Sequence, residues 1–208
     1  MKVGVIGGGN LGRRLAALWQ GAVHDVVVGV RGDERPGPGD AFRLVPVEAA
    51  AAHGEAVVLA VPFGALARAL PPLAPALAGK VVVDATNPVR DDWSPLPLGE
   101  QNSAGEEVAR LLPGARVVKA FNTVFADVMT PGRLSREGLR VTAFVAGDDE
   151  GANELVAGLA ADAGFAPLVV GPLANARHLE AMAHLNIALA VGRRGGTNAA
   201  FVYHRAEG

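Results

Sequence analysis

The glycine-rich turn at the start of the chain constrains its fold more than any other feature. An apolar run over residues 3–7 leads into Gly7, Gly9 and Gly12, and a helical pattern follows over residues 11–20. In such a strand–turn–helix unit, the first glycine permits a tight bend and the second lets a pyrophosphate approach the backbone. The third lets the helix pack closely on the strand, and the helix N-terminus offers N–H groups to the phosphates. The turn therefore predicts a dinucleotide-binding site.

Strand-like and helical segments alternate along most of the chain, which is typical of an α/β domain with a mostly parallel sheet. The strand-like runs are unbroken apolar stretches, so we expect helices on both faces of the sheet. The predicted strands span residues 3–7, 25–31, 56–62, 80–85, 116–120, 141–146 and 167–170, with a weaker one at 42–47. The predicted helices span residues 11–20, 64–70, 103–112, 150–163 and 175–194. We expect a Rossmann-type, doubly wound domain over residues 1–208, with residues 173–208 as a C-terminal helical appendage.

The composition excludes several classes of protein. Half of the 208 residues are hydrophobic, which is enough for a large core, and the net charge is only −2. Nucleic-acid binding and a polybasic membrane surface both need concentrated positive charge, so neither is expected. The chain has no cysteine, which excludes disulfides, thiolate nucleophiles and iron–sulfur clusters. Its apolar stretches are too short to span a bilayer, and no signal peptide precedes the first strand, so we expect a cytoplasmic protein.

The residue that ends the second predicted strand indicates which nicotinamide cofactor binds. NAD-binding domains usually carry an acidic residue there for the adenosine ribose, whereas this chain carries Arg31. A guanidinium binds a 2′-phosphate that a carboxylate would repel, so Arg31 favours NADP(H), with Arg35 as a second clamp. Two alternatives stay open. Asp33 or Glu34 serves the ribose if the loop folds back, or Arg31 is a solvated charge at a strand end.

Further polar and irregular segments follow the predicted strands. Two irregular loops, at residues 32–40 and 87–102, come after strands, and the second contains an isolated Trp93. Loops at the carboxyl ends of parallel strands form the binding crevice of such sheets. The residues predicted to bind the cofactor are Gly7, Gly9, Asn10, Leu11, Gly12, Arg31, Arg35, Val61, Pro62, Phe63, Asn87, Pro88, Ala120 and Asn122.

Proton donors suited to carbonyl reduction are scarce. The single tyrosine, Tyr203, has no lysine four residues on, which excludes a tyrosine–lysine dehydrogenase arrangement. Lys119, in the fifth predicted strand, is either a structural lysine or a site residue. A carbonyl acceptor needs a placed proton donor, whereas a flavin or deazaflavin needs mainly alignment. The scarcity therefore favours hydride transfer from cofactor to cofactor, and we assign no catalytic residue.

The last predicted helix carries residues with more than one interpretation. Glu180 and His184 have the spacing of a metal-ligand pair, but no third ligand stands at a matched spacing, so no metal site is expected. His178 and His184 are instead polar groups on a helix face or part of the wall of an acceptor pocket. Arg193 and Arg194 are either a solvated charge pair at a helix end or a positively charged binding site for the acidic tail of a cofactor.

Three later stretches carry a resemblance to a known family. They read D-A-T-N-P, V-K-A-F-N-T and G-P-L-A-N-A-R, at residues 84–88, 118–123 and 171–177. With the opening glycines, they resemble the coenzyme F420:NADP oxidoreductases over essentially the whole chain, and they are similar to the NADPH-binding domain of the six-transmembrane ferric reductases. The resemblance implies a 2′-phosphate on Arg31, a nicotinamide near Asn87 and Asn122, and coenzyme F420 or a flavin as the hydride acceptor. Two positions depart from the deazaflavin enzymes: Val30 replaces a common hydroxyl residue, and Asn122 replaces a histidine that some carry.

Two other functions stay open. The opening residues also resemble those of pyrroline-5-carboxylate reductases, which reduce a small imine, although the residues after Pro172 are too few for the helical dimerisation domain of those enzymes. A non-catalytic NADPH-binding sensor is the third hypothesis. The apolar surface of the last helix, with Leu185 and Leu189, makes a homodimer a further expectation.

Overall fold

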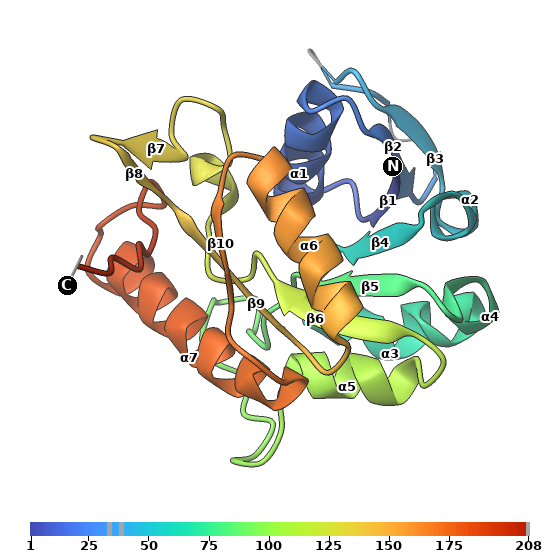
Figure 1. Cartoon of the computed structure of the whole chain (residues 1–208). Helices are drawn as coiled ribbons and strands as arrows, with labels where there is room; N and C mark the ends of the chain where they lie inside the picture. The colour runs from blue at the N-terminus through green and yellow to red at the C-terminus, as the bar shows by residue number, and fades with distance from the viewer. Residues whose placement is uncertain (33–34, 38–39, 207–208) are drawn as a thin grey trace.

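The computed structural model describes residues 1–32, 35–37 and 40–206. Its centre is a twisted sheet with helices on both faces (Figure 1). The strands are β1 (Lys2–Ile6), β2 (Asp25–Val30), β3 (Arg43–Pro46), β4 (Ala56–Leu59), β5 (Val81–Asp84), β6 (Arg116–Ala120), β9 (Thr142–Gly147) and β10 (Ala166–Val169). They lie in the order β10-β9-β6-β5-β4-β1-β2-β3. The neighbouring pairs are parallel except β6 and β9, which are antiparallel. The predicted doubly wound, mostly parallel sheet is confirmed.

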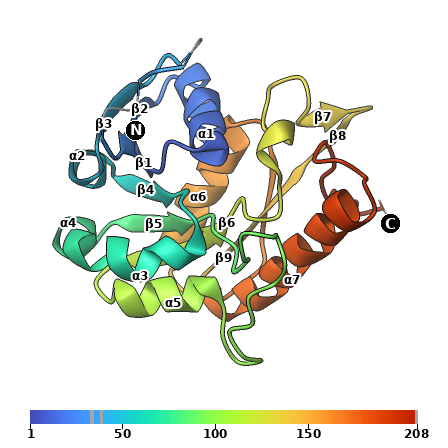
Figure 2. The same cartoon turned by 180° about the vertical axis from the view of Figure 1, so that it is seen from behind.

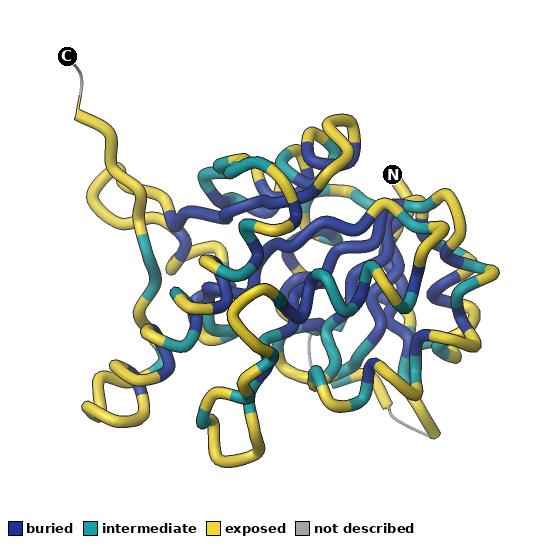
Figure 3. Tube along the Cα trace, turned by 90° about the horizontal axis from the view of Figure 1, so that it is seen from below, coloured by how far each residue is buried: buried dark blue, intermediate teal, exposed yellow. Residues whose placement is uncertain are grey.

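Helices cover the two faces of the sheet as two separate layers. One layer contains α1 (Asn10–Gly21) and α6 (Glu150–Asp162), and the other contains α2 (Val47–His53), α3 (Leu66–Ala69), α4 (Ala74–Leu77) and α5 (Ala104–Leu111). Strand β4 shows why the strand sequences are unbroken apolar runs. Ala56 and Val58 belong to the first core, whereas Val57 and Leu59 belong to the second. Figure 3 shows these strands buried at the centre of the molecule, with the exposed loops around them.

Helix α2 is not predicted from the sequence. It is short and alanine-rich, and it packs unusually close to the sheet, because β1 and β2 place Gly4 and Gly29 beneath it. A Cβ atom at Gly4 would lie 2.2 Å from the carbonyl oxygen of Ala50, and one at Gly29 would lie 2.9 Å from the Ala50 Cβ. A second unpredicted element is the hairpin β7 (Ser135–Arg136) and β8 (Leu139–Arg140), whose two turn residues both have positive φ.

The C-terminal helix packs against β9 and β10, at the β10 edge of the sheet (Figure 2). Helix α7 (Ala176–Ile187) continues as a π-helical turn over Ala188–Gly192, so the predicted helix over residues 175–194 is present with a widened last turn. The chain then returns along β9, where Thr142 N–H donates to the Phe201 carbonyl (3.1 Å) and Tyr203 N–H donates to Thr142 Oγ1 (2.8 Å). Within the described ranges, no helix has the length and apolar character needed to cross a bilayer.

Candidate functional site

A first cavity, of about 410 Å³, opens beside the glycine turn at the carboxyl ends of β1, β2 and β4. It is lined by Gly7, Gly8 and Gly9, by residues 29–31 at the end of β2, by residues 60–62 after β4, and by Arg68 of α3, among others. This position, next to a glycine turn and a strand-end arginine, is where the sequence predicts the adenosine half of a dinucleotide.

The three glycines of the turn differ in what surrounds them. Gly7 has φ +121°, and a Cβ atom there would lie 2.3 Å from the Ala60 carbonyl oxygen. A Cβ atom at Gly12 would lie 2.1 Å from the Gly7 carbonyl oxygen, so Gly12 allows α1 to approach β1. By contrast, a Cβ atom at Gly9 would meet no described atom within 4 Å. Gly7 and Gly12 are therefore required by packing, whereas the space above Gly9 is open for a ligand.

Helix α1 leaves its N-terminal N–H groups available. Its N-cap residue is Gly9, which has no side chain to cap them, and its first turn carries no acidic residue. Helices α5 and α6 are, by contrast, capped by their own side chains, with Ser103 accepting from Glu106 N–H in α5 and Asp149 accepting from Ala152 N–H in α6. An uncapped helix N-terminus that faces open space is suited to an anionic group such as a pyrophosphate.

Arg13 holds the glycine turn in place. Its Nε donates to the Gly8 carbonyl (2.7 Å), and its Nη1 forms an ion pair with Asp40. The Asp40 carboxylate also accepts from Gly37 N–H (2.7 Å). The turn, α1 and the described part of the following loop are therefore linked through one guanidinium.

Two arginines bring positive charge to the first cavity. Arg31 is exposed at the end of β2, and Arg68 is exposed on α3 and lines the same cavity. Glu48, in the first turn of α2, lines the same cavity and brings a carboxylate. The sequence does not single out Arg68, because its direction depends on how α3 is turned toward the cavity. Asp33 and Glu34, the alternative ribose partners, lie outside the described residues.

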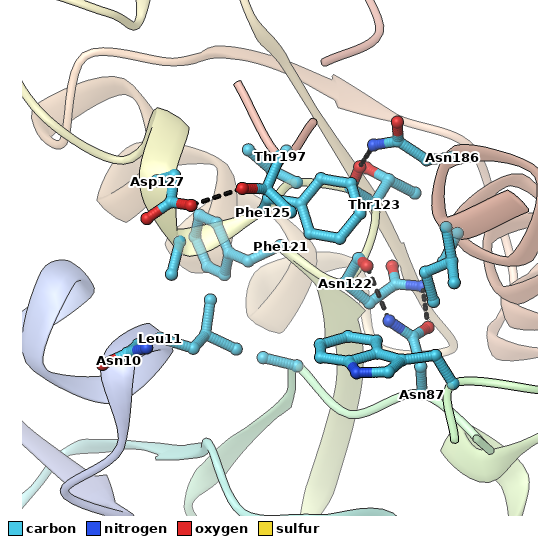
Figure 4. Close-up of a pocket in the computed structure, with 16 residues that line it drawn as sticks. Asn10, Leu11, Asn87, Phe121, Asn122, Thr123, Phe125, Asp127, Asn186 and Thr197 are labelled. Atoms are coloured by element: carbon cyan, nitrogen blue, oxygen red, sulfur yellow. Dashed lines mark hydrogen bonds between the residues drawn. The ribbon is translucent and has the colours of Figure 1, made fainter. Parts of the chain in front are cut away.

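A second cavity, of about 350 Å³, lies beside the start of α1 (Figure 4). Asn10 and Leu11 of α1 form one end, and residues of α7 and the segment after it, including Asn186 and Thr197, form another part of its wall. Trp93, Phe121, Asn122, Phe125 and Asp127 line it as well. Its wall is mostly apolar with a few amides and hydroxyls, which is typical of a pocket for a ring-shaped ligand.

Asn87 and Asn122 bind each other at the wall of the second cavity. Asn122 Nδ2 donates to Asn87 Oδ1 (2.9 Å), and Asn87 Nδ2 donates to the Asn122 carbonyl (2.7 Å). Asn122 Nδ2 also donates to the Leu179 carbonyl of α7 (3.1 Å). Asn122 Oδ1, although buried, has no hydrogen-bond partner among the described residues. A buried acceptor of this kind is costly unless a ligand donates to it.

Lys119 belongs to a buried ion cluster beneath this site. Its Nζ lies 2.9 Å from Asp84 Oδ2 and 2.8 Å from Glu180 Oε1, and it donates to the Thr86 carbonyl (2.6 Å). Burial by itself lowers the pKa of Lys119, but the carboxylates of Asp84 and Glu180 outweigh burial and hold that pKa above its ordinary value. Of the two interpretations of Lys119, the structural one fits, because the ammonium is fully buried and directed at its partners.

The residues around Lys119 also account for the metal-like spacing on α7. Glu180 accepts from the N–H groups of Ala104 and Gly105 at the start of α5, in addition to its ion pair. His184 Nε2 lies 3.2 Å from the Pro88 carbonyl. Among the described residues, no three His, Cys, Asp or Glu side chains gather as a metal site.

The residues predicted to bind the cofactor fall into three groups. The first cavity is lined by Gly7, Gly9, Arg31, Val61 and Pro62. The second cavity is lined by Asn10, Leu11, Asn87 and Asn122. In the part of the chain that the structure describes, neither cavity is lined by Gly12, Arg35, Phe63, Pro88 or Ala120. These residues thus line two cavities, one beside residues 7–9 and the other beside Asn10 and Leu11, which follow the glycine turn.

Comparison with known proteins identifies the family. The family model of coenzyme F420-dependent NADP oxidoreductases matches residues 2–88. The F420-dependent NADP reductase of Methanothermobacter thermautotrophicus is 31% identical to this chain, covering 93% of it and 91% of that protein. A crystal structure of a protein assigned as an F420-dependent NADP reductase from Arthrobacter sp. FB24 is 30% identical, with a TM-score of 0.87 over 99% of this chain and 100% of that one.

A longer relative matches as well. The metalloreductase STEAP3 of Rattus norvegicus is 35% identical over 87% of this chain, which spans 36% of the length of that protein. From the fold, the glycine turn and these matches, the chain belongs to the family of coenzyme F420-dependent NADP oxidoreductases and is an NADP-dependent oxidoreductase.

Proposed function

We propose that this protein transfers hydride between NADP(H) and coenzyme F420 or a flavin-type acceptor, using the cavity beside the glycine turn and the cavity beside the start of α1. The first cavity takes the 2′-phosphoadenosine, the N-terminus of α1 takes the pyrophosphate, and the second cavity takes the nicotinamide together with the acceptor ring. The observation that carries the proposal is the pair of cavities itself, one bordered by Arg31 and Arg68 and the other mostly apolar.

The unpaired Oδ1 of Asn122 supports the proposed position of the nicotinamide. Asn122 is 5% exposed and its Oδ1 is unpaired among the described residues, while its Nδ2 is held by Asn87 and by the Leu179 carbonyl. The side chain is therefore held in place with its acceptor oxygen buried and unpaired. The carboxamide of a nicotinamide has two N–H donors and fits such an acceptor.

The second cavity also favours a ring acceptor over a carbonyl or an imine. When bound, NADPH supplies a hydride from its nicotinamide C4, and a deazaflavin or flavin ring can accept that hydride without an acid placed by the protein. Among the described lining residues, the titratable side chain is that of Asp127, whose carboxylate accepts from the Thr197 hydroxyl. A carboxylate held in this way is poorly suited to protonate an alkoxide or an amine.

A panel of acceptors tests this proposal. Purified protein is offered NADPH with coenzyme F420, FMN, FAD, a ferric chelate or 1-pyrroline-5-carboxylate, and oxidation of NADPH is followed by absorbance. We expect reduction of F420 or of a flavin. Turnover with the imine alone would replace the proposal with an imine reductase, and tight NADPH binding without any turnover would leave a sensor.

Replacing Arg31 by alanine should weaken NADPH binding selectively. A hydrogen bond to a charged group contributes about 1.5–3 kcal/mol, so the Kd for NADPH should rise roughly 10- to 150-fold, while that for NADH should stay near the wild-type value. Arg43→Ala is the matched control, because Arg43 is exposed at the opposite end of the strands and pairs with Asp25. Isothermal titration calorimetry with both nucleotides measures the effect. An equal loss for NADPH and NADH would show that Arg31 does not contact the 2′-phosphate.

A homodimer remains a prediction. Leu185, Leu189 and Val191 on α7 and the turn after it are each about half exposed. An apolar face of this kind is unusual on a monomer. Light scattering coupled to gel filtration would give the mass, and a monomer at all concentrations would contradict the expectation.

A further inference from the structure

We infer that Trp93 stacks on the ring of the hydride acceptor and sets how tightly that acceptor binds. The inference rests on the proposed function and goes beyond it by assigning a residue to the outer part of the second cavity. Trp93 lines this cavity and is 51% exposed. The other tryptophan, Trp19, is fully buried in the core, where its Nε1–H donates to the Leu159 carbonyl (2.8 Å).

The backbone at Trp93 is in a conformation that normally selects glycine. Its φ is +66°, in the left-handed region where a side chain is disfavoured. Trp93 N–H donates to the Arg90 carbonyl and Arg90 N–H donates to the Ser94 carbonyl, both at 2.9 Å, so Trp93 occupies the left-handed position of a tight hairpin turn. Glycine would be more stable at this position. A tryptophan held there at a cost, half exposed at a cavity, points to a role in binding.

The loop around Trp93 is closed by a β-bridge and several hydrogen bonds. Val89 and Pro95 form a bridge between the two arms of the loop, and Leu96 N–H donates to the Pro88 carbonyl (2.8 Å). The side chain of Arg90 spans the turn to Ser94 and to the Pro95 carbonyl. Asp92 Oδ1 accepts from Ser94 N–H (2.9 Å), and the hydrogen bonds from Ser94 lower the pKa of Asp92.

The residues proposed to contact the two rings in the second cavity differ in how far they are buried. Asn122, the proposed partner of the nicotinamide, is 5% exposed and lies at the floor, and Phe121 beside it is 1% exposed and packs edge-on against Trp19. Trp93 is at the exposed side. The acceptor ring therefore lies between the nicotinamide and the indole, with one face toward each. Stacking of a flat heterocycle on an aromatic side chain tolerates different ring systems, which suits both deazaflavins and flavins.

Three variants test this inference in the intact protein. For Trp93→Gly we expect the KM for F420 and the Kd for oxidised F420, measured by calorimetry with NADP+ present, to rise roughly 5- to 150-fold. The Kd for NADPH should not change, and Tm should equal or exceed that of the wild type, because glycine relieves the backbone. Trp93→Phe should restore most of the F420 affinity. The matched control is Val23→Gly, which removes a side chain that is 91% exposed at φ +66°, and it should raise Tm without changing F420 binding.

The outcomes separate this inference from the proposed function. If the wild type reduces F420 and Trp93→Gly binds and reduces it equally well, the stacking assignment is wrong and the function stands. A loss of NADPH affinity in Trp93→Gly with unchanged F420 affinity would place the indole on the nicotinamide instead, which also overturns it. A wild type that reduces neither F420 nor a flavin would overturn the proposed function, and the stack with it.

Discussion

Replacing Lys119 by methionine is expected to lower the free energy of unfolding by about 3–5 kcal/mol. The ammonium is fully buried between Asp84 and Glu180, and its removal leaves two carboxylates facing each other without a cation. The remaining donors, Thr86 N–H to Asp84 and two N–H groups of α5 to Glu180, do not offset that charge. Chemical denaturation followed by circular dichroism measures the loss.

Two comparisons isolate the charge effect. Lys80→Met makes the same substitution at a less buried lysine, which donates to the Ala51 and Ala52 carbonyls at the end of α2, and should cost about 1 kcal/mol or less. Adding Asp84→Asn and Glu180→Gln to Lys119→Met should recover much of the stability, because a neutral cluster carries no unpaired charge. If Lys119→Met is no worse than Lys80→Met, the buried cluster does not stabilise the fold as argued.

The pH dependence of stability follows from the same cluster. The pKa of Lys119 is raised above its ordinary value of 10.5 in the folded protein. Its stabilising contribution is therefore fully present below that pH and is lost as the pH rises through the folded-state value. The wild type should lose this contribution in strongly alkaline solution, and Lys119→Met should lack that part of the decline.

Replacing Gly9 by valine should weaken NADP(H) binding without unfolding the protein. Gly9 has an extended backbone, φ −72° and ψ −179°, which valine adopts readily, and the space around its missing Cβ is open. The free energy of unfolding should therefore stay within about 1 kcal/mol of the wild type, the usual range for a changed N-cap residue. The valine side chain would occupy the space of the pyrophosphate and cost about 1–3 kcal/mol of binding, roughly 5- to 150-fold in Kd.

Gly12→Ala is the matched comparison within the same turn. Its Cβ would lie 2.1 Å from the Gly7 carbonyl oxygen and 3.2 Å from the Ala60 Cβ, so the backbone must shift. We expect a loss of about 1–3 kcal/mol in unfolding free energy. Calorimetric titration with NADP+ and thermal denaturation of both variants separate the two roles. Unchanged NADP+ affinity in Gly9→Val would contradict the assignment of the open space to the pyrophosphate.

The features that sequence analysis predicts correctly are those with a local signal. The glycine turn, the alternation of strands and helices and Arg31 at the end of β2 can each be identified within a window of a few residues. Even the weak strand at residues 42–47 is present, as β3. The misses need information that no short window holds. Helix α2 is seven residues long, and its position depends on glycines in β1 and β2 that allow close approach.

The same limit applies to the candidate site. The cation Lys119 is visible in the sequence, but its partner Glu180 comes from α7 and meets it only because that helix packs against the start of α5. Trp93 can be recognised as an isolated aromatic residue, whereas its left-handed backbone is a property of the folded loop. Arg68 lines the first cavity because α3 turns that side chain toward it. The direction of α3 is hard to predict from the sequence, because α3 is four residues long and lies between two short 3-10 turns.

Deuterium transfer tests the central claim, direct hydride transfer from NADPH to a ring acceptor, most directly. The two forms of NADPH that carry one deuterium on either side of the nicotinamide C4 are oxidised separately with F420, and the products are analysed by mass spectrometry. The account predicts that one form delivers its deuterium to reduced F420 and the other retains it in NADP+, because the pocket presents one face of the nicotinamide. Reduced F420 without deuterium from either form would contradict direct transfer between two rings held in one cavity.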